Sequence, residues 1–266
     1  MAIGMFPFVV ASSFLPLVIA AAEKVLRKPV FKNFVVLASV LSCILLTRLQ
    51  IFLFTAIMLA LFLIVRCLFS GRFVPLKVLK AFLGSVIRLF VPVVLVLGTT
   101  AFWFLPYNVY GSYFTSGYSE YLREISGSVP NIASIFDRTF AMNSGFGIYA
   151  GLSLTCVSTV ALLIKEFRKN LFAIYFFSLS ILMTILSVYQ IELLKLLRLE
   201  NLPLVSMIMP MRYLWVLALS LSFLFGGALK FLSKAISEKL ARNRRLRRAI
   251  EVCVLVILII VALIDF

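Results

Sequence analysis

Apolar residues along this chain form long, nearly unbroken runs that are separated by short polar or basic stretches. A helix that crosses the hydrocarbon core of a bilayer needs about 20 mostly apolar residues. Strands of a membrane barrel would instead alternate apolar and polar residues. The pattern predicts an all-α, polytopic integral membrane bundle of about eight spans, at residues 3–22, 34–46, 51–65, 82–106, 146–164, 171–189, 213–229 and 249–264.

The second and third runs are each shorter than a standard span, and Thr47-Arg48-Leu49-Gln50 stands between them. Two interpretations are open: one very long helix with a polar notch, or two short helices that turn at residues 47–50. The outer ends of the pair carry Lys28 and Arg66. Because basic ends of neighbouring spans belong on the same side of the membrane, the charges favour a hairpin.

The longest break in the apolar pattern covers residues 107–145. It is rich in Ser, Gly and Tyr, and we expect a loop with a short helix at residues 119–125. Further along, Glu192, Lys195 and Arg198 recur every third residue in a leucine-rich stretch. Such a narrow polar stripe predicts a helix at residues 191–199 that lies in the membrane interface. Residues 47–50, 107–145 and 190–212 are therefore the expected outer-face segments.

The composition agrees with a membrane protein. Hydrophobic residues make up 63% of the 266 residues and the mean hydropathy is +1.13, whereas soluble domains use about 45–50% apolar residues. The surplus is expected to face lipid. We therefore treat residues 1–266 as a single membrane domain. The chain starts directly in a span, so we also expect it to be the downstream part of a longer protein.

The formal charge of +16 follows the predicted topology. With eight spans, 20 of the 26 basic residues and 4 of the 10 acidic residues fall on one face, which gives +16 there and zero opposite. The positive-inside rule makes the basic face cytoplasmic in a prokaryotic cell membrane. The charge therefore does not indicate nucleic acid as a partner. The basic inner segments are residues 23–33, 66–80, 165–170 and 230–248.

The chain contains no histidine, which removes the commonest general base and the usual zinc-binding motifs. Its four cysteines, Cys43, Cys67, Cys156 and Cys253, lie in or beside apolar runs without a CxxC pair. They are interpreted as small core residues. The sequence therefore predicts no metal site, disulfide framework or cofactor.

Candidate chemistry collects in the outer segments. Arginine binds phosphate through a bidentate fork, and a carboxylate can act as a base. The candidate catalytic residues are Glu120, Glu124 and Asp137, and the candidate substrate-binding residues are Arg48, Gln50, Arg212 and Tyr213. A structural interpretation stands beside each role, because Glu120, Arg123 and Glu124 at helical spacing also form a solvated face with ion pairs.

The inner segment 230–248 combines a basic run with an apolar face formed by Leu232, Ile236 and Leu240. This pattern favours a helix that lies on anionic lipid. The expected membrane-surface residues are Lys234, Lys239, Arg242, Arg244, Arg245, Arg247 and Arg248.

The chain contains the short motifs Gly4-Met5-Phe6-Pro7, Leu46-Thr47-Arg48, Ala101-Phe102-Trp103-Phe104-Leu105-Pro106 and Pro210-Met211-Arg212-Tyr213. Together they resemble GT-C-type membrane glycosyltransferases, including prokaryotic relatives labelled 6-pyruvoyl-tetrahydropterin-synthase-related membrane proteins. The resemblance covers most of the chain in layout. It implies a polyprenyl-phosphate sugar as ligand, with Arg48 or Arg212 on the phosphate. The family's catalytic acid lies in the first outer loop, whereas the first connection here, residues 23–33, is basic and predicted inside.

Three functions are compatible with these observations. The leading one is a GT-C-like protein that binds or acts on a lipid-phosphate-linked sugar at the outer membrane face. A transporter or flippase-like protein is the first alternative, although charges deep in the spans are scarce. A non-catalytic subunit that associates with a partner membrane subunit is the second, because the acidic loop is missing.

Overall fold

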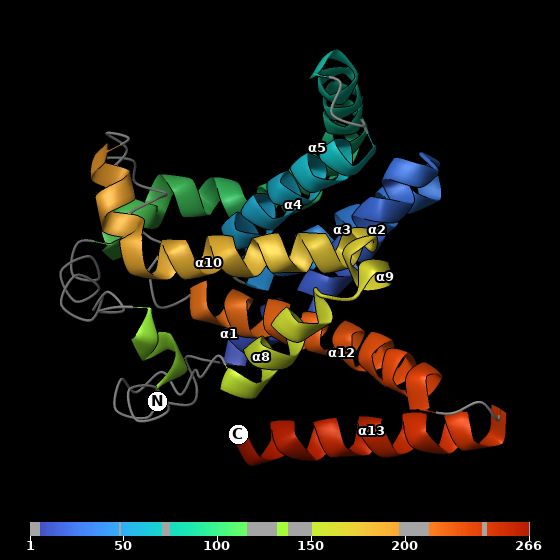
Figure 1. The fold of residues 1–266 in the computed structure, drawn as a ribbon. Helices are drawn as coiled ribbons and strands as arrows, with labels where there is room; N and C mark the ends of the chain where they lie inside the picture. Colours follow the sequence, from blue (N-terminus) through green and yellow to red (C-terminus); the bar gives the residue numbers. More distant parts are fainter. Residues whose placement is uncertain are drawn as a thin grey trace. The chain divides into compact units, whose positions relative to one another are not determined.

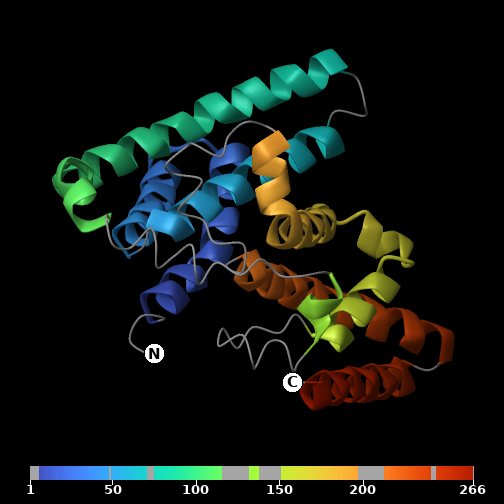
Figure 2. The same ribbon diagram turned by 90° about the vertical axis from the view of Figure 1, so that its left-hand side faces the viewer.

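A computed structural model describes residues 6–47, 49–70, 75–115, 132–137, 151–196, 213–240 and 244–265. These residues form helices joined by short turns and contain no strand (Figures 1 and 2). The all-α prediction is thus confirmed for the described part of the chain. The chain divides into two compact units, Met1–Ile125 and Ser126–Phe266, which are described separately.

Four of the described helices are long and apolar enough to cross a bilayer. Their spans are Ile51–Phe69, Val78–Phe102, Leu171–Gln190 and Tyr213–Glu238. Shorter apolar stretches occur at Phe31–Thr47, Leu152–Ala161 and Ile250–Ile260. Over its described residues the protein is therefore all-helical, with four helices of membrane-spanning length and composition where the sequence predicts about eight spans.

The predicted first span, residues 3–22, is two helices and not one. Helix α1 (Phe6–Ser13) ends at a turn on Phe14, and α2 (Leu15–Arg27) starts directly after it. Pro16 lies in the first turn of α2, where a missing N–H is harmless, whereas its ring would clash inside a continuous helix. Helix α2 also runs on through the predicted inner loop as far as Arg27.

Helices α3 (Phe31–Thr47) and α4 (Leu49–Ser70) reverse the direction of the chain, as the charge pattern predicts. Arg66, near the end of α4, forms an ion pair with Glu23 on α2 at 3.0 Å. Glu23 lies two turns before α3 begins. Because α3 and the part of α4 before Arg66 are each about 25 Å long, this ion pair requires α4 to return toward the start of α3.

Helix α5 (Pro75–Thr115) is one continuous helix of 41 residues, seen along its length in Figure 2. It packs against α3, where the hydroxyls of Ser42 and Thr99 lie 3.0 Å apart. At about 62 Å it is twice as long as the hydrocarbon core is thick. The helix includes residues 75–80 and 107–115, which the sequence assigns to the connecting segments 66–80 and 107–145. Pro75 occupies the first helical position, where proline is well tolerated.

The second unit is built around α12 (Tyr213–Leu240), which lies between α10 (Leu171–Leu196) and α13 (Arg244–Asp265) (Figure 1). Helices α8 (Leu152–Ala161) and α9 (Lys165–Arg168) also contact α12. A single turn of 3₁₀ helix, η2 (Ala133–Phe136), buries Ile135.

Three sequence assignments in this unit are corrected. In the described part of the predicted span 146–164, which is residues 151–164, the helix is the ten-residue α8. It begins after Gly151, which has a φ of 74°, and ends at a turn on residues 162–164. A positive φ favours glycine and interrupts a helix. The predicted interfacial helix at residues 191–199 is, as far as Leu196, the continuation of α10, because no helix breaker separates them.

The basic segment 230–248 is not one separate surface helix. Its first part continues α12 to Leu240, and its last part begins α13 at Arg244. Ser233 and Ser237 are buried on α12, so the packed face of this helix extends past the apolar run. The continuity of that face explains why the helix does not end at Leu229.

Aromatic rings and serine hydroxyls join the helices of the second unit. Phe167 on α9 is 1% exposed and meets Phe231 of α12 edge to face, with ring centroids 5.5 Å apart. The hydroxyls of Ser180 on α10 and Ser220 on α12 lie 2.9 Å apart. These contacts fix α9 and α10 on α12.

Candidate functional site

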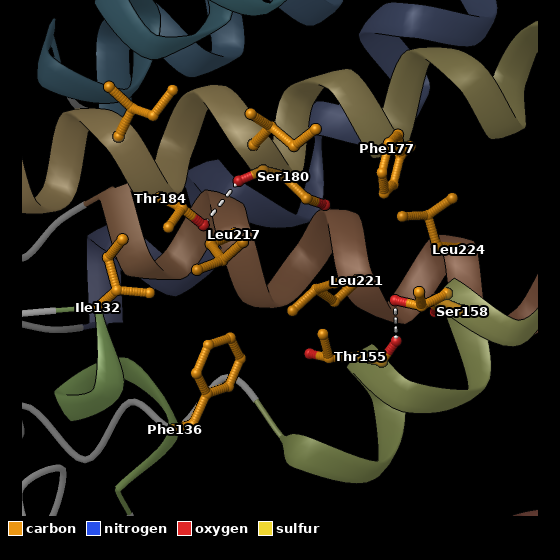
Figure 3. Close-up of a pocket in the computed structure, with 13 residues that line it drawn as sticks. Ile132, Phe136, Thr155, Ser158, Phe177, Ser180, Thr184, Leu217, Leu221 and Leu224 are labelled. Atoms are coloured by element: carbon orange, nitrogen blue, oxygen red, sulfur yellow. Dashed lines mark hydrogen bonds between the residues drawn. The ribbon is translucent and has the colours of Figure 1, made fainter. Parts of the chain in front are cut away.

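A cavity of about 300 Å³ lies within the second unit, between η2, α8, α10 and α12 (Figure 3). Apolar side chains make most of its wall and hydroxyl groups make the rest. The lining residues are Ile132, Phe136, Thr155, Ser158, Thr159, Phe177, Ser180, Ile181, Thr184, Ile185, Leu217, Leu221 and Leu224. None of these described lining residues carries a charge.

The cavity lies at the depth of the membrane-spanning helices. Its α10 wall runs from Phe177 to Ile185, in the middle of the span Leu171–Gln190. This wall is about 12 Å long. Ile132, Ile181 and Ile185 at its edge are 41–47% exposed. Thr159 of the wall is also exposed, so the cavity opens through a mostly apolar rim.

Most of the hydroxyls around the cavity donate to backbone carbonyls of their own helices. Thr155 donates to the carbonyl of Gly151 at 3.0 Å. Thr184 donates to the carbonyl of Ser180 at 2.9 Å (Figure 3). Thr159 donates to the carbonyl of Thr155 at 2.8 Å. Such bonds satisfy the donor within the helix. These three groups can offer a ligand only acceptor lone pairs.

Ser158 is the exception in the cavity wall. The residue is 3% exposed, and its Oγ has no hydrogen-bond partner among the described residues. Leaving a buried hydroxyl unsatisfied costs about 1–3 kcal/mol. The cavity wall thus combines apolar side chains with one buried hydroxyl that has no partner among the described residues. Sequence reasoning did not single out Ser158, although the density of hydroxyls on the short helix α8 was a usable signal.

Of the three candidate catalytic carboxylates, the described residues include only Asp137. Asp137 is exposed and directly follows Phe136, which lines the cavity. Its backbone N–H donates to the carbonyl of Ser134 at 3.3 Å. Glu120 and Glu124 lie outside the described residues. Of the three, only Asp137 can be placed, on the element beside the cavity.

Of the candidate substrate-binding residues, Tyr213 is the one whose side chain is described. It is the first residue of α12, 3% exposed, and lies one turn before Leu217 of the cavity wall. Gln50 lies in the first turn of α4. Arg48 and Arg212 lie outside the described residues, so the predicted phosphate site stays a prediction.

The predicted membrane-surface residues fall on two helices. Lys234 on α12 is exposed and lies 4.0 Å from Glu238, and Arg248 is exposed in the first turns of α13. Lys239 is near the end of α12, and Arg242 lies outside the described residues. Arg244, Arg245 and Arg247 belong to the first turn of α13.

A buried ion-pair cluster in the first unit was not predicted. Glu23 is 7% exposed on α2 and pairs with Arg27 and Arg66. Arg88 on α5 donates to the carbonyl of Leu26 at 2.9 Å. The sequence places Glu23 in a solvated loop, yet its spacing of four residues from Arg27 was a sign of a helix.

No group of three or more His, Cys, Asp or Glu side chains that could hold a metal ion occurs within the described residues. Comparison with known proteins finds no matching family model, no similar curated protein and no similar solved structure. Within the described residues, the protein is all-helical, with four helices of membrane-spanning length and a mostly apolar cavity in its second unit. The case for a function therefore depends on this cavity.

Proposed function

We propose that this GT-C-like membrane protein binds a lipid-phosphate-linked ligand and holds the lipid's hydrocarbon chain in the cavity of the second unit. The observation that carries the proposal is the apolar cavity at membrane depth with a mostly apolar rim. Ligand sites are concave, mostly apolar and supplied with a few polar groups. A chain that comes from the bilayer would cross this rim without leaving a mostly apolar environment.

The size of the cavity fits part of a chain. Its volume of about 300 Å³ has room for roughly ten groups the size of a water molecule, each about 30 Å³. The head group would therefore remain outside, at the membrane surface. Because no charged side chain lines the described wall, the cavity is poorly suited to an ion or a free sugar. This lining favours lipid binding over the transporter alternative.

The sugar and the polyprenyl carrier are implied only by the GT-C resemblance. If the protein transfers a sugar, Glu120→Gln, Glu124→Gln or Asp137→Asn abolishes the transfer, because one of these carboxylates is the base. Full transfer activity in all three variants would exclude that role. The shape of the cavity accommodates any hydrocarbon chain.

The eight-span topology with cytoplasmic basic segments is part of the proposal. It places Ser116 outside and Arg244 inside. Reporter fusions at these two positions should report opposite compartments. The same compartment for both would refute the orientation and the predicted outer-face segments.

Mass spectrometry of lipids extracted from the purified protein tests the proposal directly. Leu221→Trp fills the cavity from α12, whereas Leu97→Trp makes the same change on a half-exposed position of α5. We expect a phosphate-bearing lipid in the wild type and in Leu97→Trp, and its loss in Leu221→Trp. Equal amounts of lipid in all three proteins would contradict the proposal.

A further inference from the structure

Arg88 of the first unit carries a charge on an apolar, exposed stretch of α5. It lies within the span Val78–Phe102 and is itself exposed. Its neighbours Ile87 and Phe90 are among the most exposed apolar side chains of the unit. A guanidinium among lipid-facing side chains is costly unless it reaches the membrane surface or meets an anion. The groups around Arg88 therefore indicate what it binds.

One partner of Arg88 is the end of α2. Its Nη1 donates to the carbonyl of Leu26 at 2.9 Å. Leu26 lies in the last turn of α2, where carbonyls lack a partner within the helix, so this bond caps α2. The cap uses one of the five N–H donors of the guanidinium. Arg88 forms no ion pair with any described carboxylate, so the other donors are left for solvent or an anion.

The surroundings of this cap are strongly basic. Asn33 donates to the carbonyl of Lys28 at 2.7 Å, which joins the start of α3 to the end of α2. Among the described residues of the first unit, Glu23 is the one carboxylate. The basic residues that gather at this end are Lys24, Arg27, Lys28, Lys32, Arg66 and Arg88. Six cations against one carboxylate leave a net charge of +5, and the dipole of α2 offsets only about half a charge.

The ion pairs of Glu23 do not use up the cations. Arg27 and Arg66 both reach this carboxylate through their Nε atoms, so their Nη atoms take no part in the pairs. The Arg27 side chain is largely exposed, whereas that of Arg66 is mostly covered. Because Arg27 directly follows Leu26, the cations of Arg27 and Arg88 belong to the same turn of α2.

We propose that Arg88 binds the phosphate of an anionic phospholipid at the end of α2, with the cations of Arg27 and Lys28 beside it. The planar fork of arginine suits a phosphate. Val91 and Leu95 lie three and seven residues further along α5, on the same face as Arg88, and both are at least partly exposed. They offer the acyl chains an apolar surface next to the phosphate. This site reads a head group, lies in the other unit and does not depend on the cavity.

Native mass spectrometry of the purified full chain in detergent, with defined lipids added, tests the inference. The probes are phosphatidylglycerol and phosphatidylcholine with the same acyl chains. Both carry a phosphate, but the choline cation would lie among the basic residues. We therefore expect the wild type to prefer phosphatidylglycerol about ten-fold.

Charge variants locate the site. Arg88→Gln should lower the preference to about two-fold, since one basic residue next to an anionic lipid contributes roughly five-fold. Lys80→Gln removes the same charge from an exposed position of α5 about 12 Å away. Because salt screens charges over about 10 Å, the preference should stay nearly unchanged in Lys80→Gln. An effect of Lys80→Gln as large as that of Arg88→Gln would overturn the site.

Arg27→Gln keeps the cap of α2 and decides the matter if Arg88→Gln does not fold. It should lower the preference about three-fold. No preference in the wild type, or an unchanged preference in Arg27→Gln, would contradict the inference. An excess of inorganic phosphate should not displace phosphatidylglycerol. Displacement would mean that a free anion, and not a lipid, is the ligand.

Leu221→Trp separates this site from the cavity of the second unit. The preference for phosphatidylglycerol should persist in Leu221→Trp, because the filled cavity lies in the other unit. Its loss would place the anionic lipid in the cavity and overturn the inference, while the proposed function would stand. In the extraction experiment, the lipid that Leu221→Trp loses is the one held by the cavity, and the lipid at Arg88 stays in every variant.

Discussion

Replacing Glu23 tests how the first unit holds its helices together. The Glu23 side chain is 9% exposed and that of Arg66 is 21% exposed. Removing one partner of a buried ion pair costs about 3–5 kcal/mol, because the other charge stays buried and unpaired. Since a fifth of Arg66 still reaches the surface, we expect Glu23→Leu to lower the free energy of unfolding by about 3 kcal/mol.

The double variant makes this prediction sharper. Replacing both members of a buried pair by apolar residues is often neutral or stabilising. Glu23→Leu with Arg66→Met should therefore recover most of the stability that Glu23→Leu loses. Equilibrium unfolding in mixed detergent micelles, followed by circular dichroism, measures the free energy of unfolding of the wild type, of Glu23→Leu and of the double variant.

Arg27 supplies the matched control. It pairs with the same carboxylate, but its side chain is 67% exposed, and exposed helical pairs contribute only about 0.3–0.5 kcal/mol. Arg27→Met should therefore change the unfolding free energy little. A loss below about 0.5 kcal/mol in Glu23→Leu, or a double variant no more stable than the single one, would refute this account of the pair.

Two further predictions concern α12 and use the same unfolding assay. Gly226 lies in open space, so Gly226→Ala should raise the free energy of unfolding by about 0.5–1 kcal/mol through helix propensity. Gly227→Ala should leave the protein about 1 kcal/mol less stable than Gly226→Ala does, because its Cβ meets Phe167. Equal effects at the two glycines would mean that α9 does not pack there. Ser180→Ala and Ser220→Ala should couple by about 0.6 kcal/mol in a double-mutant cycle, and additive effects would rule out the hydrogen bond between them.

The helical membrane class could be predicted from the sequence, because continuous apolar runs and the surplus of hydrophobic residues admit few other folds. The reversal between α3 and α4 was also predictable. Basic residues at the ends of the pair, such as Lys28 and Arg66, had to share one side of the membrane. Both inferences use physical constraints that act on whole segments.

The ends of the helices were harder to predict. Hydropathy marks where a helix is apolar and not where it stops, so α5 and α12 continue well past their apolar runs. Conversely, α8 ends after ten residues although the sequence stays apolar to Ile164. Turns such as the one at residues 162–164 depend on packing against other helices, and a single sequence does not reveal this.

The cavity could not be predicted because it depends on the packing of four separate elements. Ser153 and Ser158 are both serines of α8, yet only Ser158 lines the cavity. Which serine lines the cavity is decided by the rotation of α8 against α12. Glu23 was missed for a related reason, since its partner Arg66 is distant in the sequence.

Photo-crosslinking in the native membrane tests the central claim, that the cavity takes a lipid chain. A phospholipid with a diazirine in its acyl chain is activated, and the labelled residues are mapped by peptide mass spectrometry. We expect adducts on Phe177 and Leu217 of the cavity, as well as on the exposed α5 residues Ile87 and Phe90. Leu221→Trp should remove the cavity adducts and keep those on α5. Cavity adducts that are absent from the wild type, or unchanged in Leu221→Trp, would contradict the account.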